Sequence, residues 1–206
     1  MDAALWKDLG VGEGGLDKLR AFVALVEKWT VRINLVARST LPEIWERHVE
    51  DSARLCLNAP ENPAIWADFG SGGGFPGIVV AVVLQAHGAK TRVILVESDL
   101  RKATFLCESA RLLDLPVEVR SERAESLPSL GADVVSARAL TALDGLCALA
   151  QRHLAPDGVA IFPKGENYEA EIDAARKNWR FQLEAVTDPR HKGAILCLRN
   201  IDRARS

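Results

Sequence analysis

Apolar residues follow a helical period over the first part of the chain. Between Leu16 and Leu35 they recur three or four positions apart, which predicts an amphipathic helix. A second helical pattern begins at Pro42 and continues to Cys56. Residues 58–64 (NAPENPA) contain two prolines and end this part. The pattern therefore predicts an N-terminal helical cap over residues 1–58.

Beyond residue 64, short apolar runs alternate with helical patterns. The runs that predict strands are residues 64–69, 92–97, 117–121, 133–137, 159–164, 181–186 and 194–199. The patterns that predict helices are residues 76–87, 100–113, 142–154 and 168–179. Alternating strands and helices favour a parallel sheet covered on both faces, and only the last two strands are too close in sequence to be parallel neighbours. We therefore expect an α/β fold over residues 64–200, with seven strands and an antiparallel terminal hairpin, and one domain over residues 1–206.

Five glycines lie within residues 67–77 (ADFGSGGGFPG), directly after the first predicted strand. Each costs roughly 0.5–1 kcal/mol relative to alanine, so the cluster must permit something that other residues do not. A glycine-rich turn between a strand and a helix brings backbone N–H groups and a helix N-terminus close to a ligand. A loop that serves packing alone is the other explanation.

The second predicted strand ends at Glu97, whose carboxylate can accept both ribose hydroxyls of an adenosine. Together with the glycines it predicts an adenosine-containing cofactor. Residues 72–77 also fit the dinucleotide pattern G-x-G-x-x-G, which keeps a nicotinamide-dependent dehydrogenase possible. The order Asp68, Gly70, Gly72, Gly74 resembles the first motif of class I methyltransferases instead, and seven strands exceed the six of a dinucleotide-binding sheet.

Composition limits the kinds of partner, metal site and location that can be expected. The formal net charge of −2 gives no global field that attracts polyanions, so a nucleic acid would need a local basic patch. The four cysteines form no CxxC pair and have no histidine at ligand spacing, so we expect free thiols and no metal site. The longest apolar run, residues 78–84, is too short to cross a membrane, and the N-terminus does not resemble a signal peptide. We expect a cytoplasmic protein.

Seven motifs together resemble the bacterial RsmG family, also called glucose-inhibited division protein B. They are WTVRINLVA (29–37), RHVEDS (47–52), DFGSGGGFPG (68–77), LVESDLRKATFL (95–106), RAESL (123–127), SARAL (136–140) and FPKG (162–165). The resemblance runs from Trp29 to Lys192. It implies a Rossmann-like class I methyltransferase that uses S-adenosyl-L-methionine to methylate N7 of a guanine in 16S rRNA of the small ribosomal subunit.

The resemblance also implies which residues contact the cofactor. Those it indicates are Gly70 and Phe75 in the glycine loop, Ala124 and Glu125 after the third strand, and Arg138 after the fourth. Where many members of the family read Ser-Arg-Ala, this chain reads Ala137-Arg138-Ala139, with Ser136 one place earlier. No role can therefore be assigned to a serine at position 137.

Guanine N7 has a free lone pair, so a methyl group can be added without removing a proton and without a general base. The sequence accordingly shows no obvious acid–base pair. We expect Arg138, Arg123 and Lys164, which follow predicted strands, to hold phosphate or guanine O6. Each could also be a surface charge or pair with a carboxylate. A small-molecule methyltransferase and a non-catalytic RNA-binding protein that senses the cofactor remain the alternatives.

Two further groups have open roles. His48 and Asp51 share a helix face and are expected to be structural rather than catalytic. Basic residues dominate the C-terminal region and could attract RNA phosphates, or form a solvated tail. They are Arg190, His191, Lys192, Arg199, Arg203 and Arg205. The sequence has no long exposed apolar stripe, so we expect a monomer.

Overall fold

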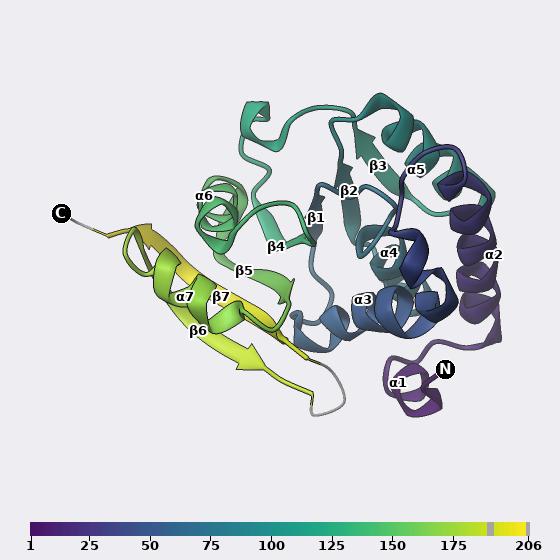
Figure 1. The fold of residues 1–206 in the computed structure, drawn as a ribbon, viewed down its shortest axis with the longest axis horizontal. Coiled ribbons are helices and arrows are strands. Elements are labelled where there is room, and N and C mark those ends of the chain that lie inside the picture. Colours follow the sequence, from purple (N-terminus) through teal and green to yellow (C-terminus); the bar gives the residue numbers. More distant parts are fainter. Residues whose placement is uncertain (189–191, 205–206) are drawn as a thin grey trace.

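The computed structural model describes residues 1–188 and 192–204, and its centre is a seven-stranded sheet (Figure 1). The strands are β1 (Ile65–Phe69), β2 (Arg92–Val96), β3 (Val117–Arg120), β4 (Ala132–Ala137), β5 (Leu154–Lys164), β6 (Trp179–Val186) and β7 (Ala194–Arg203). Their order is β3-β2-β1-β4-β5-β7-β6. The first five are parallel, whereas β7 is antiparallel to both β5 and β6. The predicted sheet and its terminal hairpin are confirmed.

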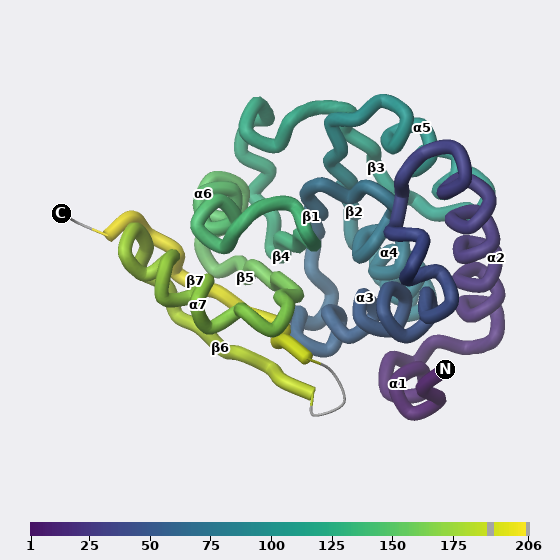
Figure 2. Tube along the Cα trace, viewed as in Figure 1, coloured from purple at the N-terminus to yellow at the C-terminus, as the bar shows by residue number. Residues whose placement is uncertain are grey.

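Helices cover both faces of the sheet (Figures 1 and 2). One face carries α4 (Gly77–Ala86) and α5 (Leu100–Leu112), with α2 (Glu13–Thr30) packed against both of them. The other face carries α6 (Leu143–His153), which packs against α7 (Tyr168–Ala175). Successive strand residues serve the two layers in turn, since Trp66 joins the core on the α4 side and Ala67 the core on the α6 side.

Helix α4 has no polar face because it has no solvent-facing side over most of its length. Every residue from Gly77 to Leu84 is buried. The helix packs against α2, α3 (Asp51–Ala53), α5 and β2. A helix that is apolar all round is expected only in such a position. It fixes the glycine-rich loop between the sheet and the N-terminal helices.

The second helix predicted from the sequence is irregular. Residues 42–56 do not form one α-helix. The chain passes instead through the 3-10 turn η1 (Arg38–Glu43), the π-helical η2 (Trp45–Glu50), α3 and the 3-10 turn η3 (Arg54–Asn58). Pro42 lies within η1 and lacks the N–H that an α-helix needs, and the Ser52 hydroxyl donates to the backbone carbonyl of His48. Both features shift the hydrogen-bond register.

The structure also contains a helix that was not predicted, and two predicted boundaries are shifted. Helix α1 (Ala3–Asp8) was not predicted; Asp2 caps it by accepting a hydrogen bond from the Leu5 N–H at 3.2 Å. Helix α2 ends at Thr30 and does not reach Leu35. Trp179, expected in a helix, begins β6, because its ring fills the core on the α6 side. None of the helices in the described ranges has the length and apolarity needed to cross a membrane.

Candidate active site

The loop after β1 is held against the end of β2. The N–H groups of Gly70 and Ser71 both donate to the carbonyl of Val96, at 2.9 and 3.1 Å. Gly70 has a φ of +64°, and a Cβ there would lie 2.7 Å from Leu140 Cδ1. The backbone angle favours glycine at this position, and any larger residue would also have to displace the exposed side chain of Leu140.

Glu97, directly after β2, binds the same loop. Its Oε2 accepts a hydrogen bond from the Gly72 N–H at 2.9 Å, and its Oε1 accepts one from the Asp99 N–H at 2.8 Å. The residue is 8% exposed, and it lines a pocket. Because each carboxylate oxygen can accept more than one hydrogen bond, Glu97 can hold the loop and a ligand hydroxyl together.

A pocket of about 240 Å³ lies beside this loop. Five predicted site residues line it: Gly70, Glu97, Arg123, Ala124 and Glu125. The last two belong to the 3-10 turn η4 (Ala124–Ser126) after β3. The structure thus brings together residues from the ends of three strands, next to the point between β1 and β4 where the strand order reverses. We call this space the cofactor pocket.

Two of the expected cofactor residues do not line this pocket. Asp68 is fully buried beneath the loop, where Trp66 Nε1 donates to Ser136 Oγ at 2.9 Å and Ser136 Oγ donates to Asp68 Oδ1 at 2.7 Å. Burial raises the pKa of Asp68 to about 6, with the Glu97 carboxylate acting in the same direction. The Phe75 ring packs 5.1 Å from that of Phe22. Both residues support the loop from below.

Two of the expected glycines also lie outside the lining. Gly72 gives its N–H to Glu97, as described above. Gly74 has a φ of +83°, and a Cβ there would lie 2.7 Å from Phe22 Cζ. Their direct effect is on the shape of the loop.

A second pocket, of about 590 Å³, adjoins the first through Ala139 and Leu140, which line both. Four cationic side chains line it, which are Arg47, Arg138, Lys164 and Lys192. The acidic residues in its lining are Asp51 and Glu171. We call this space the basic pocket. It supplies the local positive patch that the overall charge of −2 does not.

Arg138 lies in the basic pocket and not in the lining of the cofactor pocket, where the sequence also placed it. Its Nη2 donates to the backbone carbonyl of Arg47 at 2.7 Å. Its Nη1 is buried and has no hydrogen-bond partner among residues 1–188 and 192–204. Burial lowers the pKa of the guanidinium, the nearby Arg47 charge lowers it further, and Asp51 raises it. A buried donor without a partner is costly, so this guanidinium has unused hydrogen-bonding capacity beside the basic pocket.

Lys164 has a carboxylate partner. Its Nζ donates to Glu171 Oε2 at 2.7 Å and to the Thr141 carbonyl at 3.1 Å, and the side chain is only 10% exposed. The same Glu171 oxygen accepts the Leu143 N–H at 2.9 Å. A phosphate would have to compete with Glu171 for this ammonium. The structure therefore places Lys164 as a support for the turn that leads into α6.

His48 is buried within η2, next to the pocket residue Arg47. Its Nε2 is hydrogen-bonded with Thr40 Oγ1 at 2.8 Å, and its ring lies 5.2 Å from Phe75. Burial lowers the pKa of His48 to about 4, and the charges of Arg138 and Arg47 act in the same direction. The ring is therefore neutral near pH 7, as a packing residue would be.

Sequence reasoning missed Arg47 as a pocket residue, although it stands within the RHVEDS motif. Of the basic C-terminal residues, Lys192 lines the basic pocket, whereas Arg199 and Arg203 belong to β7 and not to a solvated tail. Arg203 covers the Trp179 ring at 4.0 Å. Arg190, His191 and Arg205 lie outside the described residues. Within the described ranges no cluster of acidic, histidine or cysteine side chains is suited to a metal ion.

Comparison with known proteins adds the family. The family model described as rRNA small subunit methyltransferase G matches residues 15–195. A Cereibacter sphaeroides protein named ribosomal RNA small subunit methyltransferase G is 50% identical over 192 residues, which are 92% of this chain and 93% of the relative. A Ruegeria protein of the same name is 45% identical over 197 residues, which are 95% of this chain and 96% of the relative.

Solved structures resemble the fold at low sequence identity. A SAM-dependent methyltransferase from Aquifex aeolicus aligns with a TM-score of 0.60 at 14% identity, covering 76% of this chain and 93% of that one. A ribosomal protein L11 methylase from Lactobacillus delbrueckii subsp. bulgaricus aligns with a TM-score of 0.58 at 19% identity, covering 77% and 79%. These likenesses show the class I methyltransferase fold.

Proposed function

Because the chain belongs to the rRNA small subunit methyltransferase G family, we propose that it methylates N7 of a guanine in 16S rRNA of the small ribosomal subunit, with S-adenosyl-L-methionine as methyl donor. The observation that carries the choice of acceptor is the position of Arg138. Its side chain lines a pocket next to the cofactor pocket, and its buried Nη1 lacks a hydrogen-bond partner among the described residues.

The cofactor pocket fits an adenosine-containing ligand. When bound, S-adenosyl-L-methionine supplies a methyl group on a positively charged sulfur. Glu97 would accept the ribose hydroxyls, and Ala124 and Glu125 would border the adenine. Gly70 leaves the backbone bare where a side chain would collide with Leu140. Arg123 lines this pocket, so we assign it to the cofactor side and not to the RNA.

The basic pocket fits a guanine and its phosphate. Arginine is the side chain that most often recognises the O6 and N7 edge of guanine, and here the Arg138 guanidinium would donate to O6 while N7 stays free to react. Arg47 and Lys192, which are exposed at the same pocket, would hold phosphate. No residue has to remove a proton from N7, so the site needs alignment and not acid–base catalysis.

The test of the function is methyl transfer from labelled S-adenosyl-L-methionine to small subunits from a strain that lacks this gene, followed by mapping of the modified nucleotide. We expect one N7-methylguanine in 16S rRNA. Arg138→Ala should lower kcat/KM for subunits by about tenfold to hundredfold, the range of one lost base contact, and Arg138→Lys should lie between it and the wild type. Cofactor Kd should change less than twofold in either variant.

A matched control is Arg111→Ala, which removes an exposed arginine of α5 that pairs with Glu108. It should leave kcat/KM unchanged. Cofactor binding without any methylated product from subunits would favour a non-catalytic RNA-binding protein. Methylation of a small molecule but not of subunits would favour the other alternative.

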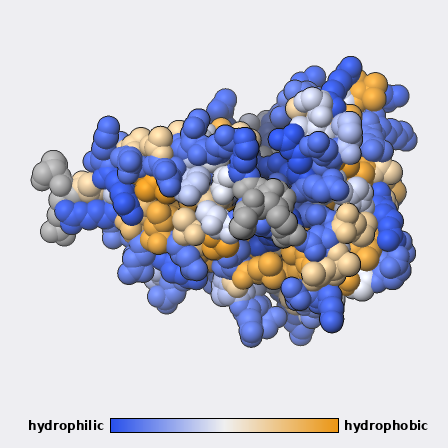
Figure 3. Space-filling view, turned by 60° about the horizontal axis from the view of Figure 1, so that its bottom comes forward, coloured by the Kyte–Doolittle hydropathy of each residue, from blue (hydrophilic) through white to orange (hydrophobic). Residues whose placement is uncertain are grey.

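We also propose that the chain acts in the cytoplasm as a monomer. On the face in Figure 3, hydrophobic surface forms separate patches with hydrophilic areas between them. Large apolar side chains are exposed at separate points of the chain. Val31 follows α2, Leu57 lies in η3, and Leu100 and Leu112 lie at the two ends of α5. Sedimentation at micromolar concentration should give a single species of one chain mass.

A further inference from the structure

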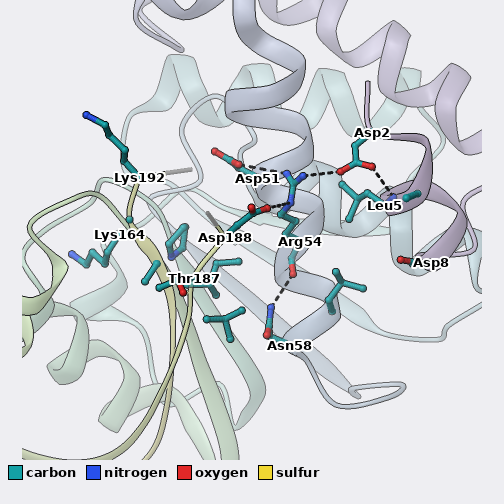
Figure 4. Close-up of a pocket in the computed structure, with 17 residues that line it drawn as sticks. Asp2, Leu5, Asp8, Asp51, Arg54, Asn58, Lys164, Thr187, Asp188 and Lys192 are labelled. Atoms are coloured by element: carbon teal, nitrogen blue, oxygen red, sulfur yellow. Dashed lines mark hydrogen bonds and ion pairs between the residues drawn. The ribbon is translucent and has the colours of Figure 1, made fainter. Parts of the chain in front are cut away.

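A cavity of about 420 Å³ opens between the N-terminal helices and the adjoining ends of strands β5, β7 and β6 (Figure 4). Its walls are largely apolar, with Leu5 from α1, Leu57 from η3 and Ile195 from β7. The volume is that of a small ligand site, and a planar nucleobase fits within it. Neither Arg138 nor any residue assigned above to the cofactor lines this cavity.

The cavity continues into the basic pocket. Asp51, Pro163, Lys164 and Lys192 line both spaces. Lys192 at this shared rim is 81% exposed, and its partner Glu166 is itself 64% exposed at 3.1 Å. Such a surface pair is weak, so the ammonium remains available to a phosphate. An RNA strand with one base in the basic pocket would therefore bring the adjoining nucleotide to the mouth of the cavity.

A buried arginine keeps the cavity formed. Arg54, whose side chain is only 12% exposed, lies within 3.1 Å of Asp2, 3.7 Å of Asp51 and 4.0 Å of Asp188 (Figure 4). These three carboxylates come from the N-terminus, from α3 and from the segment after β6. The cluster joins segments distant in sequence, and Asp8 of α1, which is exposed and also lines the cavity, gives it acceptor oxygens. Carboxylates accept hydrogen bonds from the amino groups of bases.

We propose that this cavity binds the unstacked base of a nucleotide next to the target guanine, and that it prefers a base with an amino group over uracil. The proposal rests on the proposed function. Proteins that read single-stranded RNA hold splayed bases against apolar surfaces and contact their edges with polar groups. Apolar walls, acidic groups inside and a cation at the shared rim match a base on its sugar-phosphate chain.

Two pairs of variants test the cavity: one pair adds a bulky side chain to it, and the other removes an apolar residue from its wall. Ala4→Trp places an indole where α1 lines the cavity, and Ala3→Trp puts the same group on α1 outside the lining. Leu57→Ser removes an apolar wall residue that is 53% exposed, and Leu112→Ser removes a leucine that is 51% exposed at the end of α5. All four positions tolerate change, because none lies in the core.

We expect Ala4→Trp and Leu57→Ser to raise KM for small subunits about tenfold, the scale of one lost base contact, with cofactor Kd unchanged. Ala3→Trp and Leu112→Ser should leave KM within twofold of the wild type. In a short single-stranded oligoribonucleotide, replacing the adenine beside the guanine by uracil should weaken binding to the wild type and have no effect on Ala4→Trp. Equal KM values for Ala4→Trp and Ala3→Trp would overturn the proposal.

The two hypotheses fail differently. If the wild type methylates subunits and Ala4→Trp does so with unchanged KM, the function stands and the base site is refuted. If no subunit is methylated, the function is refuted, and fluorescence titration with an oligoribonucleotide that carries 2-aminopurine beside the guanine still tests the cavity. Binding that Ala4→Trp weakens and Ala3→Trp does not would support the base site on its own.

Discussion

Asp68 is a carboxyl group that the fold keeps away from water, and replacing it by asparagine should change how stability depends on pH. It is 0% exposed under the glycine loop and accepts the Ser136 hydroxyl. Burial raises its pKa from 3.8 to about 6, because the charged form loses hydration that the Ser136 hydroxyl restores only in part, and Oδ2 has no hydrogen-bond partner among the described residues. An asparagine side chain at this position could accept the same Ser136 hydrogen bond and would never carry charge.

The magnitude follows from linkage. A folded-state pKa above the ordinary value means that the folded chain binds this proton more tightly than the unfolded chain does. The stabilisation is therefore complete below about pH 4 and is lost as pH rises through about 6. At about 1.4 kcal/mol per pH unit, the loss is about 3 kcal/mol. His48 acts in the opposite direction. Its pKa of about 4 lies below the usual 6.5, so its contribution to the stability of the folded chain increases as pH rises.

Because the two groups oppose each other, the assay must compare variants. Urea unfolding of the wild type and Asp68→Asn, at intervals between about pH 4.5 and pH 7.5, gives the difference in unfolding free energy at each pH. The His48 contribution is present in both proteins and cancels. We expect the variant to gain about 2 kcal/mol relative to the wild type across this interval, because the unfolded carboxyl is already largely ionised at pH 4.5.

The control is Asp173→Asn, which makes the same chemical change at an exposed position of α7. Its difference from the wild type should stay flat over the same interval. The reasoning would be refuted by an equally flat difference for Asp68→Asn, since burial would then have no effect on the titration of this carboxyl.

Two further substitutions separate the cofactor pocket from the basic pocket. Gly70→Val should weaken cofactor binding by about a hundredfold in calorimetry, because valine is strained at a φ of +64° and would displace Leu140 within the lining of the cofactor pocket. Its control is Gly88→Val, at a φ of +67° with open space around it, which should cost about 1–2 kcal/mol of stability and leave cofactor affinity unchanged. Lys164→Met removes the ammonium partner of Glu171, which keeps the Leu143 N–H and is 31% exposed, so stability should fall by about 1 kcal/mol and methyl transfer to subunits should fall more than cofactor affinity. Equal losses of cofactor affinity for Gly70→Val and Lys164→Met in calorimetry would contradict both assignments.

The sequence predicts those parts of the site that depend on local pattern. The glycine loop and Glu97 follow the first two strands, and parallel strands bring their carboxyl ends to one edge of the sheet. The same logic correctly places Ala124 and Glu125 beside them. It could not show that the Asp68 side chain points away from the cofactor pocket. Strand β1 is buried on both faces, so alternation of polar and apolar residues carries no signal there.

Contacts between distant segments could not be predicted in the same way. The hydrogen bond from Arg138 to the Arg47 carbonyl spans 91 positions and leaves no period in the sequence. The apolar pattern of residues 42–56 indicates a helical path but not its hydrogen-bond register, and the register decides where the π-helical turn presents Arg47. By contrast, Lys164 and Glu171 are only seven positions apart, and an acidic residue in the first turn of α7 was a usable signal for this pair.

The residues between the two pockets bear most directly on the proposed chemistry. Ala139 has a φ of +52°, which an alanine adopts only at a cost of about 1 kcal/mol or more. This turn directs Arg138 toward Arg47 and places Leu140 across Gly70, so the chain separates the cofactor pocket from the basic pocket by these two residues. A methyl group and a ring nitrogen must meet in line at this boundary. Since no proton leaves N7, the boundary has to supply alignment alone, and a strained turn fixed by contacts on both sides can provide that where an acid–base pair would have no task.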